Sequence, residues 1–406
     1  INTDWVSVEN LKGQAKKTIK NGDILYSEIR PKNKRYAYIK NIPNTDEYVV
    51  STKLMVLRNK DENILNTDYL YYFLTFDATI NFLQKRAESR IGSFPQITFN
   101  ILKTLKIRLP NLNIQKQIAK VLSDLDAKIE INNQINAKLE AIAKTLYEYW
   151  FVQFDFPDAD GKPYKSSGGK MVYNEELKRE IPDGWEVREL KDIAKCIMGQ
   201  SPKGSSYNRE YIGMPLLNGP ADYENGALKG NLFTTEPKRT CQKDDLVLCI
   251  RATIGNLVYS EQEFCLGRGV AAVRPNAYKM SELIYYYLTQ EIERFKIQAT
   301  GSIIKGITKD DLINSKCFTP HESLIESFHN KIKPMFDNIR SNKKQNQKLA
   351  ELRDWLLPML MNGQVRVGEN PNMDLEDETK KRGKMMKEMN ENVGMVAEEK
   401  DEYNSK

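Results

Sequence analysis

Basic and amide side chains recur at matching places in the two halves of this sequence, and these side-chain types bind nucleic acids. Arg and Lys contact phosphates and guanine edges, whereas Asn, Gln, Ser and Thr contact other bases. Any single candidate is also compatible with a solvated surface charge, and the pairing between halves is what favours a binding role. The candidates in the first half are Arg30, Lys32, Lys34, Arg35, Arg86, Arg90, Ser93 and Gln96, and those in the second half are Lys203, Ser205, Tyr207, Arg209, Arg251, Thr253, Arg268, Ser302 and Lys305.

Residues that would form an active site are absent or badly spaced. Asp183, Glu189 and Lys191 resemble a metal-nuclease pattern, but five residues between the two acids are too few for two strands that hold Mg²⁺. Asp183-Gly184 indicates a turn instead. Neither an Asn/Asp-Pro-Pro-aromatic loop for a flipped base nor a Gly-rich phosphate loop occurs. The sequence therefore predicts no catalytic residue and no metal site.

The five cysteines and the charge balance bound the class of protein. No Cys-x-x-Cys pair occurs among them, so we interpret them as reduced, buried thiols of a cytoplasmic protein. The net charge is +6, but from Glu369 onward there are 7 basic and 11 acidic residues, against 54 and 44 in the rest. That positive body favours a polyanionic partner. No run of 18 apolar residues predicts a membrane span.

The elements that position the candidates form an internal repeat with a period near 210 residues. The run Tyr69 to Thr75 (YLYYFLT) recurs from Leu283 to Thr289 (LIYYYLT). Gly92-Ser93 followed by Ile97-Thr98 recurs as Gly301-Ser302 followed by Ile307-Thr308. A long helical pattern follows each copy, so the chain is predicted to be a duplicated unit.

Heptad spacing in both long segments predicts a coiled-coil seam. An asparagine falls at the same layer of each segment, and a polar pair there would fix the helix register; the alternative is that both face solvent. A second stripe is expected at Val121, Ile135, Ile142 and Tyr149. The predicted helix-pair interface is Ile118, Leu125, Asn132, Leu139 and Leu146 with Phe328, Met335, Asn342, Leu349 and Leu356.

Ordered motifs over roughly residues 15 to 365 resemble the specificity subunit of type I restriction–modification systems. Pro182-Asp-Gly-Trp185 resembles the opening of that family's target-recognition domain, and Gly199-Gln-Ser-Pro202 resembles the turn that follows. The helix start from Leu109 to Asp126 and the connector Tyr149 to Gly169 are also similar. Trp185 precedes Asp245 by 60 residues, whereas Asp23 has only 22 residues before it. We therefore expect the first recognition domain to lack about 38 residues at its start, as in a truncated record or gene.

The resemblance implies an α+β fold with pseudo-twofold symmetry, in which two tandem target-recognition domains of mixed sheet plus helices are separated by two long antiparallel coiled-coil helices. We expect recognition domains at 1–110 and 185–320, coiled-coil helices at 111–151 and 321–363, a connector at 152–184, and a charged, disordered tail at 364–406.

By the same resemblance, the chain is a non-catalytic reader of a bipartite double-stranded DNA site. It would act with two methyltransferase subunits and with restriction–translocase subunits. S-adenosylmethionine, ATP and Mg²⁺ would be cofactors of these partners, and this subunit would hold none. The alternatives are an autonomous DNA-modifying enzyme, which the missing motifs disfavour, and a coiled-coil scaffold without DNA specificity.

Overall fold

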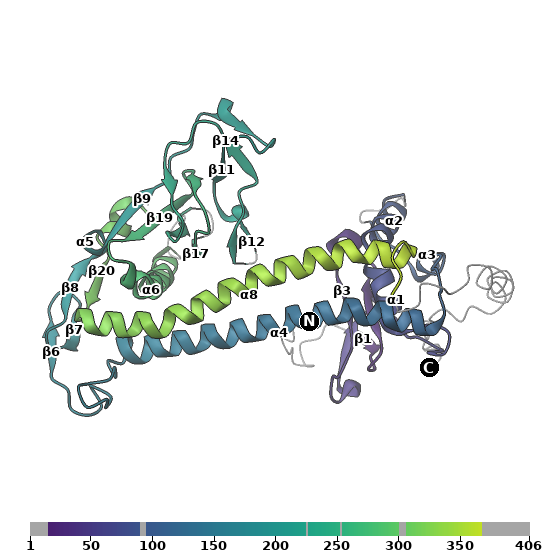
Figure 1. Cartoon of the computed structure of the whole chain (residues 1–406), viewed down its shortest axis with the longest axis horizontal. Coiled ribbons are helices and arrows are strands. Elements are labelled where there is room, and N and C mark those ends of the chain that lie inside the picture. The colour runs from purple at the N-terminus through teal and green to yellow at the C-terminus, as the bar shows by residue number, and fades with distance from the viewer. Residues whose placement is uncertain (1–14, 90–94, 225, 252–253, 300–305, 368–406) are drawn as a thin grey trace, which may run out of the picture. The chain divides into compact units, whose positions relative to one another are not determined.

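A computed structural model covers residues 15–89, 95–224, 226–251, 254–299 and 306–367 of the chain. The chain separates into two compact units. Unit 1 comprises residues 1–133 and 343–406, and unit 2 comprises residues 134–342. The two longest helices, α4 (Leu112–Tyr147) and α8 (Glu322–Asn362), each supply residues to both units (Figure 1).

The centre of unit 1 is an antiparallel three-stranded sheet in the order β3–β2–β5. Its middle strand is buried along its whole length, as the apolar run from Ile24 to Tyr26 predicts for the first three of its four residues. Helix α1 and the described ends of α4 and α8 share one apolar core with this sheet. The strands and helices are β1 (Ala15–Thr18), β2 (Ile24–Ser27), β3 (Tyr36–Tyr38), β4 (Val49–Ser51), β5 (Leu54–Leu57), α1 (Thr67–Thr75), α2 (Asp77–Glu88) and α3 (Phe99–Leu102).

Unit 2 contains a four-stranded antiparallel sheet, β17–β16–β19–β9, and a five-stranded sheet, β10–β14–β11–β18–β15. In the second sheet β11 and β18 run parallel, so this sheet is mixed. The strands are β6 (Met171–Asn174), β7 (Arg179–Pro182), β8 (Glu186–Glu189), β9 (Ala194–Met198), β10 (Tyr207–Asn208), β11 (Met214–Leu217), β12 (Tyr223–Glu224), β13 (Ala227–Leu228), β14 (Leu232–Thr234), β15 (Thr240–Cys241), β16 (Leu246–Cys249), β17 (Leu257–Tyr259), β18 (Phe264–Leu266), β19 (Val270–Pro275) and β20 (Lys316–Thr319).

Short helices join these strands, and α6 packs on β17 and β19. The helices of unit 2 are α5 (Leu190–Ile193), α6 (Ser281–Ala299), α7 (Lys309–Ile313) and a π-helical turn, Glu148–Val152, that ends α4. The chain is thus a mixture of helices and largely antiparallel sheet, which agrees with the α+β class expected from sequence.

The internal repeat extends to strand register. In unit 1, β2 pairs with β5 from Ile24↔Leu57 to Ser27↔Leu54. In unit 2, β16 pairs with β19 from Leu246↔Val273 to Cys249↔Val270. The two pairings match residue for residue, so the two halves share one local architecture.

A buried aspartate precedes the central strand of each unit and binds one arginine through both carboxylate oxygens. Asp245 accepts two hydrogen bonds of 2.7 Å from Arg274, and Asp23 accepts two of 2.8 Å from Arg58. The Asp245 carboxylate also accepts from the backbone N–H of Gln242, which closes the turn before the strand. Charge-assisted, bidentate pairs of this kind fix geometry strongly. The sequence pattern of an aspartate followed by aliphatics is therefore a structural anchor.

Helices α4 and α8 pack through a seam with alternating three- and four-residue spacing. In α4 the fully buried positions include Ile118, Leu122 and Asn132 in unit 1, and Asn136 and Ala143 in unit 2. Within the predicted interface, Phe328 of α8 is also buried. The half-buried members of that interface are Leu125, Leu139, Leu146, Met335, Asn342, Leu349 and Leu356.

The second stripe predicted for α4 is wrong at Ile135, Ile142 and Tyr149, which are exposed, whereas Val121 is half-buried against the unit 1 core. Ile135 is 41% exposed and Ile142 is 53% exposed. Their neighbours Asn136 and Ala143 occupy the seam instead. A heptad pattern leaves open whether the second stripe lies three or four residues after the first, and here the spacing of four is the buried one.

Asparagine pairs do lie in the seam, but with a shifted register. In unit 1, Asn132 donates hydrogen bonds to Asn346 (2.8 Å) and Gln345 (2.7 Å). In unit 2, Asn342 donates to Asn136 (2.9 Å). Each predicted asparagine thus binds an asparagine four residues beyond its expected partner. The offset of 210 residues relates the two pairs, so each unit holds one copy of the same polar contact.

Candidate nucleic-acid interface

Three turns meet in unit 2 because glycines allow their backbones to approach closely. The backbone N–H of Gln200 donates to the carbonyl of Leu266, and that of Arg268 donates to the Ser201 hydroxyl. A Cβ on Gly269 would lie 1.9 Å from the backbone carbonyl oxygen of Asn218. Only glycine fits there. The Gly-Gln-Ser-Pro turn is therefore held against the turn that carries Arg268.

A line of backbone hydrogen bonds links this meeting point to Arg251. Ile250 donates its N–H to the carbonyl of Gly269 (2.9 Å), and Ile307 donates to the carbonyl of Ile250 (2.9 Å). Arg251 and Arg268 thus each adjoin one end of the Ile250–Gly269 hydrogen bond, and both side chains are exposed. Two cations on adjacent turns, aimed at solvent, suit a phosphate backbone or guanine edges.

The polar segment from Lys203 to Arg209 adjoins these turns. Its 3-10 turn, Gly204–Ser206, is fixed by the Ser206 hydroxyl, which donates to the carbonyl of Lys203 and contacts Thr234 Oγ1 at 2.8 Å. Lys203, Ser205 and Arg209 are exposed, while Tyr207 is half-buried. Arg209 lines an open hollow together with Asn218, Gly219, Pro220, Ala221, Asp222, Asn231 and Leu232.

Unit 1 repeats the same line of backbone hydrogen bonds. Glu28 donates its N–H to the carbonyl of Lys53 (3.0 Å), and Ile97 donates to the carbonyl of Glu28 (2.8 Å). Gln96 belongs to this line and donates from Nε2 to the Glu28 carboxylate at 2.7 Å. Glu28 stands where unit 2 has Ile250, so this cluster carries an acidic group that unit 2 lacks.

The four basic residues from Arg30 to Arg35 are exposed around a 3-10 turn, Pro31–Asn33. Arg30 and Lys34 have left-handed backbones, with φ of 49° and 51°. Lys34 forms an ion pair with Asp77 (2.8 Å), and this hydrogen bond raises the pKa of Lys34 above its ordinary value. Its charge is therefore partly engaged within the protein, whereas Lys32 and Arg35 present theirs to solvent.

Arg86 lies on α2, where its guanidinium stands over the ring of Phe82 at 5.3 Å. Five candidates fall outside the described residues, so the structure neither places nor excludes them. They are Arg90, Ser93, Thr253, Ser302 and Lys305.

Two residues that the sequence did not single out belong with these loops. Lys53 is exposed and lies on the hydrogen-bonded line of unit 1, at the position of Gly269 in unit 2. Tyr211 is 78% exposed on the turn after Arg209, has a φ of 62°, and lies 5.0 Å from the Phe233 ring. An exposed tyrosine beside an exposed cation is suited to contact a phosphate of the DNA backbone. Aligning the repeats strand by strand would have found Lys53; no sequence signal marks Tyr211.

Residues of the nuclease-like pattern serve structural roles. Asp183 forms an ion pair with Lys170 (2.9 Å), and Glu189 pairs with Lys191 and precedes the single helical turn of α5.

His321 is exposed, whereas His329 is buried and hydrogen-bonded to Glu282 (2.6 Å). Within the described residues, no three His, Cys, Asp or Glu side chains gather as a metal site would require.

The five cysteines form no disulfide bond and are largely buried. Cys241, Cys249, Cys265 and Cys317 are buried, and Cys196 is half-buried. Burial raises the pKa of the Cys196 thiol to about 11. Among the described helices, none has the length and apolar character to cross a lipid bilayer.

Comparison with known proteins matches two segments of the chain, residues 2–141 and 182–351, to the type I restriction modification DNA specificity domain. The specificity subunit of the type I restriction enzyme HindI of Haemophilus influenzae is 30% identical, over 88% of this chain and 90% of the relative. The putative MjaX specificity subunit of Methanocaldococcus jannaschii is 31% identical, over 89% and 83%.

One solved structure, a type I restriction–modification S subunit from M. genitalium, is similar with a TM-score of 0.55. It is 18% identical, and the match covers 85% of this chain and 84% of that one. At this identity the likeness concerns the fold alone. The two matched segments follow the duplication of the strands and of the hydrogen-bonded loops. The chain belongs to the family of type I restriction–modification DNA specificity subunits.

Proposed function

We propose that this chain reads DNA sequence for a type I restriction–modification complex through two loop clusters, one in each unit, and catalyses no reaction itself. One observation carries the proposal. The same two backbone hydrogen bonds, Ile250–Gly269 and Ile307–Ile250 in unit 2 and Glu28–Lys53 and Ile97–Glu28 in unit 1, hold exposed basic and polar side chains in both units. A reader of two different DNA half-sites needs the same backbone framework twice, with different side chains on each copy to contact different bases.

Chemistry at these loops supports DNA over other partners. Arg251 and Arg268 are exposed and lie on turns whose backbones are held by neighbouring turns, so their stems are positioned before binding. Preorganised guanidinium groups suit bidentate contacts to guanine or phosphate. Up to residue 368 the chain has 54 basic and 44 acidic residues, a balance that favours attraction to the phosphate backbone.

We further propose that each unit reads one half of a bipartite site and that the helices set the spacer between the halves. Helices α4 and α8 each contribute residues to both units, so inserting residues into these helices alters the connection between the two units. The asparagine contacts Asn132–Asn346 and Asn342–Asn136 support one fixed register for the pair.

The partners and cofactors follow from the same proposal. Two methyltransferase subunits would bind the helical and connector regions and methylate adenine with S-adenosylmethionine. Restriction–translocase subunits would join them and use ATP and Mg²⁺. Target-recognition domains at 1–110 and 185–320 remain our assignment of the two readers.

The first experiment is genome-wide mapping of methylated adenine in the source organism, with and without this gene. A reader role predicts that methylation at one bipartite motif disappears when the gene is deleted. The motif then supplies a defined duplex for binding measurements.

Single substitutions then test the loops. Arg268→Ala and Arg251→Ala, in the chain complexed with its methyltransferase partners, should weaken binding to the target duplex by roughly 5- to 100-fold at fixed salt, as loss of a base or phosphate contact does. The control is Arg188→Ala, because Arg188 is exposed on β8 and pairs with Glu186 away from the turns. Unchanged affinity in both loop variants would favour a scaffold without DNA specificity.

Helix length tests the spacer. Insertion of seven residues into both α4 and α8 keeps each seam in phase. The methylated motif should then keep its two halves and change only the spacing between them. An unaltered motif in cells carrying this variant would overturn the role of the helices.

A further inference from the structure

Exposed polar side chains gather at one end of the five-stranded sheet of unit 2, β10–β14–β11–β18–β15. Strands β10, β11 and β18 end there, whereas β14 and β15 begin there, as the registers of these strand pairs require. The residues that flank these strand ends are therefore neighbours across the sheet, and we call them the sheet-end row. In sheet order the row is Arg209, Asn231, Asn218, Arg268 and Arg239.

All five side chains of the sheet-end row are exposed. Among the residues that the structure describes, none forms a hydrogen bond or an ion pair with any of these five side chains. Arg209, Asn218 and Asn231 line the same open hollow, whose volume is about 610 Å³. The row thus offers guanidinium groups at both ends and two amides between them to a partner in solution.

The position of Asn218 is fixed by two neighbouring segments. Its backbone N–H donates to Asp222 Oδ2 (2.6 Å). The carbonyl of the preceding residue, Leu217, accepts from the N–H of Gly267 (2.7 Å). The side-chain oxygen of Asn218 lies over Gly267, 2.2 Å from the place that a Cβ would occupy. The amide is therefore set before any partner binds, beside the turn that carries Arg268.

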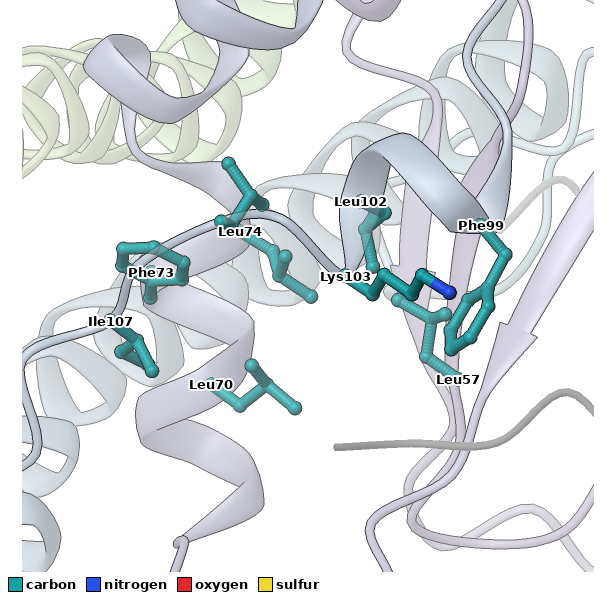
Figure 2. A pocket seen from close by; sticks show the side chains of 9 residues that line it. Leu57, Leu70, Phe73, Leu74, Phe99, Leu102, Lys103 and Ile107 are labelled. Atoms are coloured by element: carbon teal, nitrogen blue, oxygen red, sulfur yellow. The ribbon is translucent and has the colours of Figure 1, made fainter. Parts of the chain in front are cut away.

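An apolar pocket in unit 1 has a different character (Figure 2). It lies between α1, β5 and the segment after α3, and eight of its nine lining side chains are apolar. Its volume is about 10 Å³, which is roughly the room that one water molecule needs. It therefore admits neither a base nor a phosphate, whereas the hollow beside the sheet-end row is large enough and polar enough for either.

The length of the sheet-end row matches the width of a DNA major groove. Neighbouring strands lie ~4.8 Å apart, so five strand ends span about 19 Å and the three central ones about 10 Å. The groove is about 12 Å wide, so the central side chains fit inside it and the two outer ones reach the backbones on either side. Asparagine forms paired hydrogen bonds with N6 and N7 of adenine, and arginine binds phosphate.

We propose that the sheet-end row reads the half-site of unit 2 across the major groove and that Asn218 specifies an adenine in it. Arg209 and Arg239, at the ends of the row, bind phosphates. Asn231 and Arg268 lie one strand spacing from Asn218 and contact the same base pair or the next one. The inference rests on the proposed DNA-reading function and adds the base that one residue recognises.

The test uses the full chain complexed with its methyltransferase partners. Fluorescence anisotropy measures its affinity for the duplex that methylation mapping identifies and for every single-base-pair variant of that duplex. The unaltered complex should lose roughly 5- to 100-fold in affinity when one particular A·T pair is replaced. In Asn218→Ala the same replacement should cost less than about twofold, because the amide that distinguishes adenine is gone. Preferences in the other half of the motif should stay as they are.

Two further variants separate base reading from other roles. Arg209→Ala should weaken binding to every duplex by a similar factor and lower the salt dependence by about one phosphate contact, without changing any base preference. Asn276→Ala is the matched control, because Asn276 is also exposed but follows β19 at the end of that strand opposite to Gly269. It should change neither affinity nor preference.

A chemically altered duplex keeps the proposal falsifiable if Asn218→Ala does not fold. 7-Deazaadenine lacks the N7 acceptor, so at one adenine of the motif it should weaken binding of the unaltered complex by at least about fivefold. The proposal is overturned if no adenine is sensitive, if Asn218→Ala keeps the full preference, or if it weakens all duplexes alike. Equal binding of the motif and an unrelated duplex by the unaltered complex is a different result, which would overturn the DNA-reading function itself.

Discussion

Asp245 offers the sharpest test of what holds unit 2 together, because its carboxylate is 2% exposed and binds Arg274 through both oxygens. Asp245→Asn keeps the side-chain volume but removes the negative charge. Arg274 then faces an amide that cannot accept both guanidinium hydrogen bonds. Loss of one member of a buried pair costs about 3–5 kcal/mol. The Arg274 side chain is 29% exposed, so water offsets part of that cost, and we expect about 3 kcal/mol.

The neighbouring aspartate supplies a matched control. Asp244 pairs with Arg340 at 2.9 Å, but its side chain is 40% exposed and its φ is 69°. Asp244→Asn tolerates that left-handed backbone and disturbs only a surface pair, so we expect a loss below about 1 kcal/mol.

Urea unfolding, followed by tryptophan fluorescence and by circular dichroism, measures both variants. Trp150 and Trp185 are buried in unit 2, at 3% and 7% exposed, so their emission reports on that unit. Coincidence of the two signals checks that one transition is measured. If Asp245→Asn and Asp244→Asn differ by less than about 1 kcal/mol, the pair does not anchor the sheet and the argument from burial fails.

Three further outcomes follow from the seam and the thiols. Leu122→Ala, at a fully buried position of α4, should lower the free energy of unfolding by about 2–5 kcal/mol in urea unfolding. Ile142→Ala, at a 53% exposed position, should change it by less than about 0.5 kcal/mol. Equal losses in the two variants would support the second stripe predicted from the sequence. Asn346→Ala removes one hydrogen-bond acceptor of the buried Asn132 and should cost about 1–2 kcal/mol in the same assay, and a neutral result would mean that Gln345 alone satisfies that amide. Because burial raises the pKa of the Cys196 thiol to about 11, roughly one such thiol in a thousand is ionised at pH 8. The native protein should therefore react slowly with a thiol-specific disulfide reagent, and all five cysteines should react only after unfolding. Fast reaction of the folded chain would contradict this.

The repeat and the helices could be predicted from the sequence because both are local or periodic signals. Recurrence of the tyrosine-rich run marks the duplication, and seven-residue spacing marks α4 and α8. Motif order then indicates the family. For the candidate site, only the types of side chain could be predicted from the sequence. Arg and Lys residues after a strand indicate that a basic cluster exists, but they do not show which turns lie against each other.

Tertiary structure decided which of several equally periodic choices is buried. Ile135 and Ile142 are more apolar than Asn136 and Ala143, yet the latter face the seam, because the partner helix lies against the positions spaced by four. The asparagine partners depend on how the two helices align with each other, and the sequence of one helix alone does not specify that alignment.

The loop cluster depends on approaches between segments far apart in the sequence. Asn218 meets Gly267 and Gly269, and Ile250 meets Gly269 and Ile307, only after the strands have paired. Sequence spacing fixes local periodicity, whereas burial depends on which surface the fold brings opposite each residue, and that is a property of the whole chain.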